Sequence, residues 1–319
     1  MKMRNEIVSE WLEQSPWAKW QRHAMTGDAS ARRYERLTDT SGGCVILMDA
    51  QPDVCGSQAR FVEISKHLSG LGLSAPKILN WDNTLGLLVL EDLGQIDFAR
   101  HLQKHPDDER KLYDAAVDVL IELGRTPAPS NLQKMTPAVG AEMIDIGFEW
   151  AATNKSQSLA EDVKAELTTL LSVVSPNPAT LSLRDFHAEN LIWRPDKTAH
   201  ATVGLLDFQD AFITHPAYDL ASLLRDARRD VDPNLVGPLV KRMGGGEKFT
   251  LAFHVMAVQR NLRILGIFER LAKRDGKESY LNLIPRVRDH LRTDLKAPGL
   301  ARIAPLVERA FNIPEGQTK

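Results

Sequence analysis

The sequence predicts an α+β fold with two lobes: a small antiparallel β lobe carrying one main helix, and a larger, mostly helical lobe. Three features support this prediction. Short apolar and β-branched runs fill the first 92 residues, with one helical pattern among them. From residue 93 onward the apolar spacing is helical, and a single β-rich interval, residues 182–208, interrupts it. We therefore expect lobes over residues 1–92 and 93–319.

The β lobe should contain short strands around one helix. Phe61, Ile64 and Leu68 recur at i, i+3 and i+7, which predicts the helix. The strand candidates are apolar runs bounded by turn residues: residues 34–37, 44–48, 77–81 and 85–90. Because strands precede and follow the helix, we expect an antiparallel sheet with that helix packed on it.

The second lobe should be built mainly from helices. Six segments place apolar residues at helical spacing: residues 107–124, 137–152, 159–174, 218–229, 249–273 and 284–292. The β-rich interval between the third and fourth of these segments contains a short hairpin. It also carries the polar residues on which the functional prediction depends.

Composition excludes several classes of protein. The chain has 40 basic and 42 acidic residues and a formal net charge of -2, so no global charge attracts nucleic acid or an anionic membrane. Cys44 and Cys55 cannot form a disulfide framework and do not have zinc-type spacing. No apolar run has the length of a signal core or membrane span. We expect a cytoplasmic protein without nucleic-acid or membrane partners; its oligomeric state stays open.

Polar residues of the β-rich interval form a pattern suited to phosphoryl transfer. Asp185 and Asn190 lie five positions apart, an apolar hairpin follows, and Asp207 ends its second strand. Asp185 would accept the proton of an attacking hydroxyl group. Asn190 and Asp207 would hold Mg²⁺, because a hard cation prefers oxygen ligands. An Asp-Asn pair alone also fits a helix cap and a turn, so the prediction depends on the joint pattern.

On these residues the chain resembles the aminoglycoside phosphotransferase and choline kinase branch of the protein-kinase-like fold. Asp185, Asn190 and Asp207 match its catalytic and metal motifs, and residues 215–221 match the segment that follows the metal aspartate. The resemblance covers nearly the whole chain. It implies ATP and Mg²⁺ as cofactors, and it implies that Asp219 braces the catalytic loop.

Three further segments, residues 27–34, 205–211 and 221–229, are similar to the bacterial cell-wall sugar kinases. These enzymes phosphorylate the anomeric hydroxyl of N-acetylmuramate and N-acetylglucosamine. The resemblance implies a small sugar as substrate and a place in peptidoglycan recycling toward a UDP-sugar. It also implies that Glu91 and Leu93, at the junction of the lobes, contact the nucleotide.

The nucleotide side departs from the usual kinase pattern. The turn at residues 27–30 has one glycine, although Ser30 and backbone N–H groups would still suit a phosphate. The strand at residues 44–48 contains no lysine, whereas a kinase strand lysine normally contacts the phosphates. Either Arg32 or Arg33 supplies the missing charge, or the protein binds nucleotide poorly. A solvated hairpin edge is the alternative interpretation of the two arginines.

Candidates for the sugar site are spread over the helical lobe. Glu142, Asp145 and Glu149 would form an acidic stripe on one helix that accepts hydrogen bonds from sugar hydroxyls, or would simply be a solvated face. His187 and Asp210 lie close in sequence to the catalytic residues, and His187 would contact substrate or order the loop. Arg260 would pair with the lactyl carboxylate of N-acetylmuramate, or would be a surface arginine.

The leading prediction is therefore an ATP-dependent amino-sugar kinase. One alternative is a kinase of another small hydroxyl compound, such as an aminoglycoside or an amino alcohol. The other is a nucleotide-binding module without catalysis, motivated by the missing lysine. ATP turnover with and without sugar separates the three.

Overall fold

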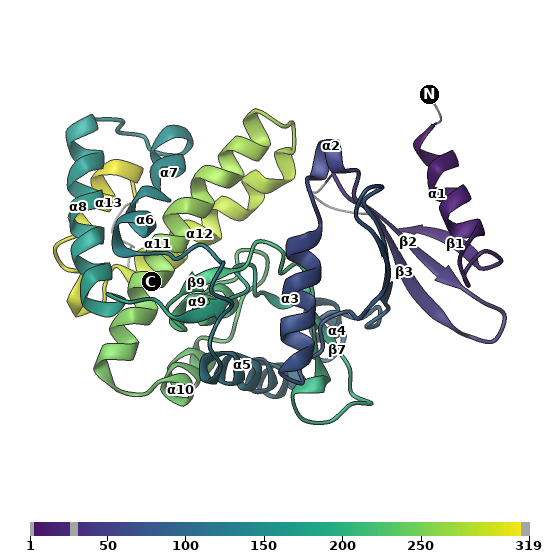
Figure 1. Cartoon of the computed structure of the whole chain (residues 1–319). Coiled ribbons are helices and arrows are strands. Elements are labelled where there is room, and N and C mark those ends of the chain that lie inside the picture. The colour runs from purple at the N-terminus through teal and green to yellow at the C-terminus, as the bar shows by residue number, and fades with distance from the viewer. Residues whose placement is uncertain (1–2, 26–30, 314–319) are drawn as a thin grey trace. The chain divides into compact units, whose positions relative to one another are not determined.

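The computed structural model describes residues 3–25 and 31–313. The chain divides into two compact units, which are described separately: Met1–Asp97 with Leu191–Gln209, and Phe98–Asn190 with Asp210–Lys319. The first unit is a sheet with few helices and the second is mostly helical (Figure 1). The predicted α+β fold with a small antiparallel β lobe and a larger helical lobe is confirmed. The hairpin of residues 191–209 groups with the sheet, whereas the boundary expected from sequence assigned it to the helices.

The first unit is organised around a five-stranded antiparallel sheet. Its strands, in spatial order, are β1 (Gln21–Met25), β2 (Arg33–Thr38), β3 (Cys44–Asp49), β5 (Leu87–Glu91) and β4 (Ile78–Asp82). The predicted strands at 34–37, 44–48, 77–81 and 85–90 are all present within about two residues. The edge strand β1 has no apolar alternation and is exposed throughout, so its sequence carries no strand signal.

The two faces of this sheet have different environments. Helix α1 (Arg4–Glu13) covers one face of the sheet. Its Val8 and Leu12 pack in one cluster with the apolar residues of that face, which are Leu37 of β2 and alternate residues of β3 and β5. Tyr34 and Arg36 point to the opposite face, because side chains alternate along a strand. The predicted helix is α3 (Ala59–Gly70), which follows the one-turn helix α2 (Pro52–Cys55).

The hairpin that groups with the sheet consists of β7 (Leu191–Trp193) and β8 (Val203–Leu205), joined by η3 (Ala199–Thr202). Backbone hydrogen bonds tie it to the unit: Leu205 N–H donates to the Ser74 carbonyl (2.8 Å), and Trp193 N–H donates to the Ile96 carbonyl (2.9 Å). Just past β8, the Phe208 ring stacks on Phe61 of α3 at 5.0 Å. The segment that carries Asp207 is therefore fixed to this unit.

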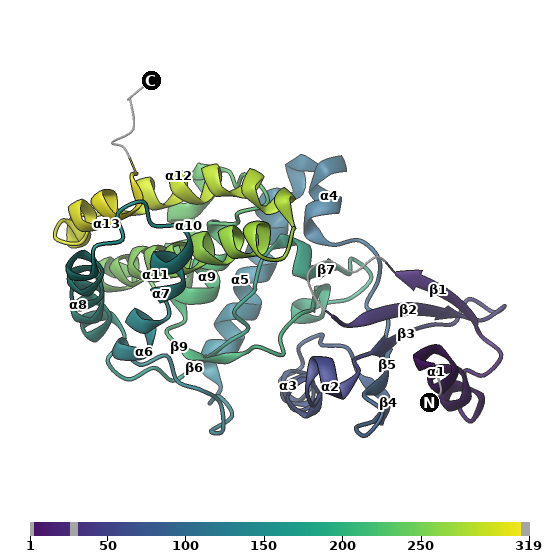
Figure 2. The same cartoon turned by 90° about the horizontal axis from the view of Figure 1, so that it is seen from above.

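The second unit is built around the long, largely buried helix α11 (Gly246–Lys273). Helices α7, α8, α9 and α12 pack against it (Figure 2). Its other elements are α4 (Phe98–Lys104), η1 (Pro106–Asp108), α5 (Glu109–Arg125), α6 (Pro137–Glu142), α7 (Asp145–Trp150), α8 (Gln157–Val174), β6 (Thr180–Ser182), η2 (Ala188–Asn190), β9 (Phe212–Thr214), α9 (Ala217–Leu224), α10 (Pro233–Met243), η4 (Glu278–Leu283), α12 (Ile284–Asp294), η5 (Pro298–Leu300) and α13 (Ala304–Phe311). Among the described residues, no helix combines the length and apolar character that crossing a membrane requires.

One predicted helix is interrupted. The segment 137–152 forms α6 and α7 rather than a continuous helix. Close packing of α7 on α11 accompanies this break: a side chain at Gly147 would come within 2.5 Å of the Leu262 carbonyl oxygen, and one at Gly266 within 2.2 Å of the Ile146 carbonyl oxygen. The backbones of α7 and α11 therefore contact each other at Gly147 and Gly266, where no side chain would fit.

Candidate active site

The loop between β6 and η2 carries Asp185 and is held from behind by Asp219 of α9. The Asp219 carboxylate accepts hydrogen bonds from Ser182 Oγ (2.7 Å) and from the backbone N–H groups of Leu183 (2.7 Å) and Arg184 (3.0 Å). Arg184 adopts a left-handed conformation with φ of 73°. A non-glycine residue in that region is strained, and here the three hydrogen bonds to one carboxylate stabilise it. Asp185 follows immediately and is half-buried.

The environment of Asp219 opposes its charge. Burial raises the pKa of this carboxyl to about 6, the hydrogen bonds from Ser182, Leu183 and Arg184 act in the lowering direction, and the charge of Asp185 raises it further. The contribution of the Asp219 carboxylate to the loop is therefore the three hydrogen bonds that it accepts at once.

Asn190 and His187 complete the loop from the inside. Asn190 Nδ2 donates to the Asp185 carbonyl (2.9 Å) and lies 3.2 Å from His187 Nε2. Burial, followed by the charges of Arg228 and Arg260, lowers the pKa of His187 well below its usual value, so the ring is neutral and its Nε2 can accept from the amide. The amide nitrogen of Asn190 is thus hydrogen-bonded within the loop. Its amide oxygen, Oδ1, is the atom that could bind a cation.

Asp207 follows β8 in the first unit and is exposed. It too adopts a left-handed conformation, with φ of 57°, and its Oδ1 accepts a hydrogen bond from Gln209 Nε2 (2.7 Å). Strained non-glycine backbone often marks a functional position. Asp207 belongs to the first unit and Asn190 to the second.

The donor chemistry of these two residues suits Mg²⁺. An amide oxygen and a carboxylate are hard ligands, and Mg²⁺ typically takes one or two protein ligands and completes its shell with water and phosphate oxygens. Among residues 3–25 and 31–313, no group of three or more His, Cys, Asp or Glu side chains could hold a metal ion. The histidines His101 and His105 of this part of the chain belong to no such group.

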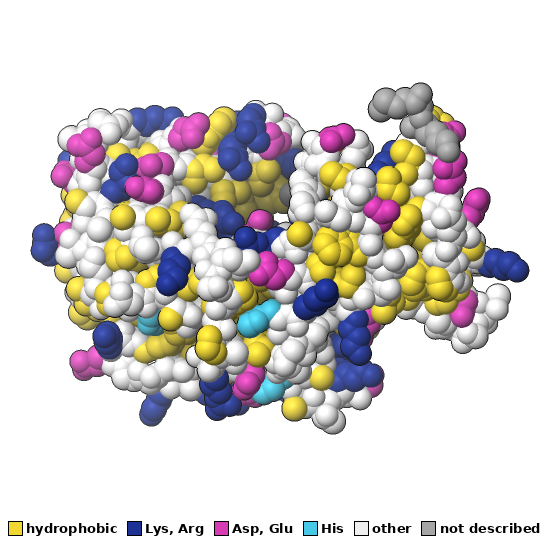
Figure 3. All heavy atoms as spheres, viewed as in Figure 1, with side chains coloured by type: hydrophobic (Ala, Val, Ile, Leu, Met, Phe, Trp, Pro, Cys, Tyr) yellow, Lys and Arg dark blue, Asp and Glu magenta, His cyan; other side chains and the backbone are white. Residues whose placement is uncertain are grey.

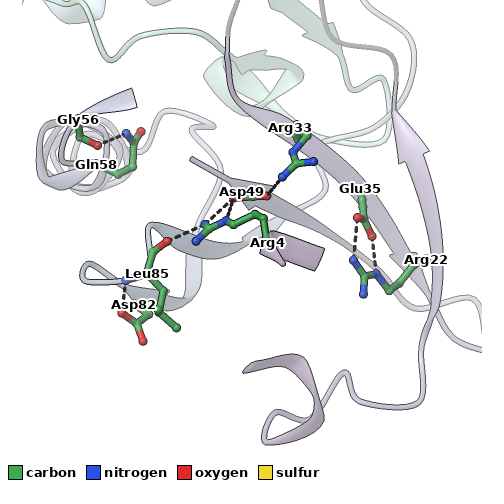
Figure 4. Close-up of polar contacts among 9 residues, drawn as sticks. All are labelled: Arg4, Arg22, Arg33, Glu35, Asp49, Gly56, Gln58, Asp82 and Leu85. Carbon is green, nitrogen blue, oxygen red and sulfur yellow. Dashed lines mark hydrogen bonds and ion pairs between the residues drawn. The ribbon is translucent and has the colours of Figure 1, made fainter. Parts of the chain in front are cut away.

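The two arginines proposed to replace the strand lysine point in opposite directions. Arg33 donates to Asp49 at the end of β3 (3.0 Å), where Arg4 of α1 also binds (Figure 4). Arg32 donates to Gln58 Oε1 (3.1 Å) and hydrogen bonds to Tyr34, on the other face of the sheet. Burial raises the pKa of the Tyr34 hydroxyl, Arg32 lowers it and Asp207 raises it. Arg32 thus shares its surroundings with Asp207, and Arg33 does not.

The remaining nucleotide candidates lie in or beside the first unit's sheet. Glu91 ends β5, pairs with Arg194 (3.3 Å) and donates its backbone N–H to the Lys77 carbonyl (2.9 Å). Leu93 is buried beside Gly204 of β8. Ser30 lies outside the described residues.

The acidic sugar-site candidates are exposed. Glu142 ends α6 while Asp145 and Glu149 lie on α7, so the expected single stripe is wrong, because the helix breaks between them. Asp145 pairs with Lys164 (2.9 Å). Asp210 is also exposed, in a turn before β9. Acidic and basic side chains are interspersed on the face drawn in Figure 3.

Basic residues gather around the catalytic loop, and of these only Arg260 was a predicted site residue. Arg260 is 4% exposed and its charge acts on His187. Arg263, one turn further along α11, interacts electrostatically with Asp185, and Arg228 interacts with His187. No local pattern could have revealed this grouping, because helix packing alone brings α11 to the loop.

Comparisons with known proteins show the family and the fold. A relative from Caulobacter vibrioides, named N-acetylmuramate/N-acetylglucosamine kinase, is 32% identical over 96% of each chain. Among solved structures, a choline/ethanolamine kinase family protein from Mesorhizobium loti matches with a TM-score of 0.64 at 16% identity, covering 96% of this chain and 99% of that one. The amicoumacin kinase hAmiN, in complex with AMP-PNP and Ca²⁺, matches with a TM-score of 0.62 at 14% identity, covering 92% and 94%. The model of the phosphotransferase enzyme family matches residues 22–253, and the chain belongs to that family.

Proposed function

We propose that this protein transfers the γ-phosphoryl group of ATP to the anomeric C1 hydroxyl of N-acetylmuramate and N-acetylglucosamine. The observation that carries the proposal is the braced loop that presents Asp185 beside Asn190, in a chain that is 32% identical to a kinase named for these two sugars. The product would be a sugar 1-phosphate, an intermediate suited to peptidoglycan recycling toward a UDP-sugar. Because such a route draws on ATP, we propose a cytoplasmic location.

Each step of the transfer has a residue to support it. Asp185 accepts the proton of the C1 hydroxyl as its oxygen forms a bond to the γ-phosphorus, and the bond between that phosphorus and the β,γ-bridging oxygen breaks. ADP leaves with the electron pair. Bound Mg²⁺, held by Asn190 Oδ1 and the Asp207 carboxylate, would offset the charge of the phosphates. Asp219 and His187 act by holding the loop.

Arg32 is the better candidate for the missing strand lysine, because it lies on the sheet face shared with Tyr34 and is influenced by the same surroundings as Asp207. Its planar guanidinium suits a phosphate oxygen. Ser30, Glu91 and Leu93 remain proposed nucleotide contacts. The proposed sugar contacts are His187, Asp210, Glu142, Glu149 and Arg260, of which Arg260 and His187 are buried beside the loop.

The test is a substrate panel with product identification. The purified protein and Mg-ATP are offered N-acetylglucosamine, N-acetylmuramate, their 1-O-methyl glycosides, an aminoglycoside and choline, and products are identified by phosphorus NMR. We expect both free sugars to be phosphorylated and both glycosides to be inert, because their C1 oxygen is blocked. A phosphorylated glycoside would mean that another hydroxyl accepts the phosphoryl group. Turnover of the aminoglycoside or choline alone would favour a kinase of another small alcohol.

A substitution links the chemistry to the loop. Asp185→Asn should retain nucleotide binding and lower turnover by roughly 10²- to 10⁴-fold, the usual contribution of a general base. Asp196→Asn, in the exposed turn of the hairpin, is the matched control. Turnover of Asp185→Asn close to that of the control would exclude this assignment.

A further inference from the structure

Helix α11 carries two arginines whose charges act on residues of the catalytic loop: Arg260 acts on His187, and Arg263 interacts with Asp185. Arg260 and Arg263 are three residues apart and therefore share a helix face. Arg260 is 4% exposed, and its Nη1 is buried without a hydrogen-bond partner among the described residues. Within residues 3–25 and 31–313, neither guanidinium forms an ion pair. A buried guanidinium whose N–H groups lack a bonded acceptor is costly, so Arg260 calls for an explanation.

Other arginines of the same unit show the usual arrangement. Arg225 is bound to the buried Asp294 by three hydrogen bonds of 2.8–3.2 Å. Arg229 binds Glu109 and Tyr113 Oη, and Arg286 binds Asp230. The fold thus supplies an acid to each of these three arginines, whereas Arg260 and Arg263 have no acid within ion-pair distance in the described part of the chain.

The charges around the two arginines define where an anion would bind. Asp226 lies near Arg260, but its carboxylate accepts from the backbone N–H groups of Arg228 (2.8 Å) and Ala188 (3.4 Å) instead. Arg263 interacts with Asp185, the proposed base, and with Tyr218, whose buried hydroxyl has no partner in the described part of the chain. An anion bound by the arginines would therefore lie beside the position of the acceptor hydroxyl.

We propose that Arg260 and Arg263 together bind a carboxylate carried by the sugar, and so determine the preference for an acidic over a neutral substrate. The proposal rests on the proposed function. A forked guanidinium pairs with a carboxylate through two parallel hydrogen bonds. N-acetylmuramate carries such a group on its lactyl ether, and N-acetylglucosamine has a hydroxyl there. The arginines thus act on specificity, while Asp185 acts on both sugars alike.

The experiment compares the two sugars in four proteins: wild type, Arg260→Gln, Arg263→Gln and the control Arg302→Gln, whose side chain is 81% exposed. For N-acetylmuramate we expect kcat/KM to fall roughly 10- to 100-fold in at least one of the first two variants, as for the loss of a charged hydrogen bond. For N-acetylglucosamine, which has no carboxylate to lose, we expect kcat/KM to fall at least about 5-fold less than for N-acetylmuramate. An equal fall for both sugars would overturn the proposal and indicate that the arginines contact the phosphoryl group.

A second arm needs no substitution and so does not depend on folding of the variants. Wild-type protein is offered N-acetylmuramate whose lactyl carboxylate has been converted to a methyl ester. The ester should be used with a kcat/KM that is lower than for the free acid by a similar factor, and Arg260→Gln should not lower it further. An ester used as well as the acid would overturn the proposal. If wild type phosphorylated neither free sugar, the proposed function itself would be wrong. That result differs from a failure of the arginine proposal, in which both sugars are still phosphorylated.

Discussion

The carboxylate of Asp219 accepts a 3.0 Å hydrogen bond from the backbone N–H of Arg184, the residue that precedes Asp185. This contact joins the first turn of α9 to a residue with left-handed backbone, and two further hydrogen bonds from Ser182 and Leu183 reinforce it. One buried side chain thus determines where Asp185 lies. The family resemblance implied a supporting role for Asp219, and the geometry shows how that support is made.

Removing this carboxylate should damage both stability and turnover. In Asp219→Ala, two backbone N–H groups and the Ser182 hydroxyl lose their acceptor, and each buried donor left unsatisfied costs about 1–3 kcal/mol. Arg184 can then relax from its strained conformation and displace Asp185. We expect a lower urea midpoint and a lower kcat with little change in KM for ATP.

The matched control lies on the same helix. Ser222 is fully buried in α9, and its hydroxyl has no partner among the described residues. Ser222→Ala removes an unpaired polar group and should be neutral or stabilising. Equal effects of the two substitutions on kcat would mean that the Asp219 contacts do not position Asp185.

Some features of the protein depend only on residues that are close together in the sequence. Asp185, Asn190 and Asp207 could be predicted from sequence as candidates, because the chemistry of phosphoryl transfer restricts the residue types within a short interval. The apolar strands β3 and β5 could be predicted for a similar reason, since each is a continuous apolar run.

Other features depend on packing between distant segments and leave no local signal. The helical periodicity of 137–152 continues through the break, because the break reflects contact of Gly147 and Gly266 between α7 and α11. Arg32 and Arg33 look equivalent in sequence, and only strand alternation and the acid at Asp49 separate them. Arg263 shares the predicted helix with Arg260, but its proximity to Asp185 arises from the fold and has no local signal.

The two arginines provide a matched pair for the nucleotide site. Arg32→Ala should raise the KM for ATP roughly 10- to 100-fold, as for the loss of a charge-assisted hydrogen bond to phosphate. Arg33→Ala should leave that KM within about 3-fold, because Arg33 faces Asp49 on the other side of the sheet. The loss of its ion pair should cost little stability, because the Arg33 side chain is 58% exposed and Arg4 still binds the buried Asp49.

Steady-state kinetics with varied ATP at saturating sugar make this comparison. Arg36 is a poor control, although it lies nearby, because it binds Asp92 through two hydrogen bonds on the face that Tyr34 shares. An increase in KM for Arg33→Ala alone would reverse the assignment. No effect of either change would leave the phosphates without a cationic partner from this turn and favour weak nucleotide binding.

Asp207 provides the test of the metal site. Asp207→Asn keeps the size of the side chain but removes its charge, so the Mg²⁺ concentration that gives half-maximal turnover should rise at least about 10-fold. Gln209→Ala removes only the hydrogen-bond donor to Asp207 Oδ1, and should shift that concentration much less. An unchanged Mg²⁺ dependence in Asp207→Asn would exclude it as a ligand.

The last prediction concerns acid stability and His215. Its Nδ1 accepts a hydrogen bond from the Ala217 N–H (3.1 Å) at the start of α9, so the ring is neutral in the folded protein. Burial, and then Lys248, lower the pKa of His215 to about 4. The unfolded chain binds a proton near its ordinary pKa of about 6.5, and the folded chain does not. The resulting stability is therefore present above pH 6.5 and is lost as the pH falls toward 4.

His215→Asn should reduce this loss, because asparagine can accept the same hydrogen bond and does not titrate. Between pH 7 and pH 4.5, the free energy of unfolding should fall by up to about 2.4 kcal/mol less in the variant than in wild type. Asp219, with its pKa raised to about 6, changes stability in the opposite direction over part of this range, but it is present in both proteins and cancels in the difference. Urea unfolding curves at the two pH values measure that difference. Parallel losses in the two proteins would mean that protonation of His215 does not oppose folding.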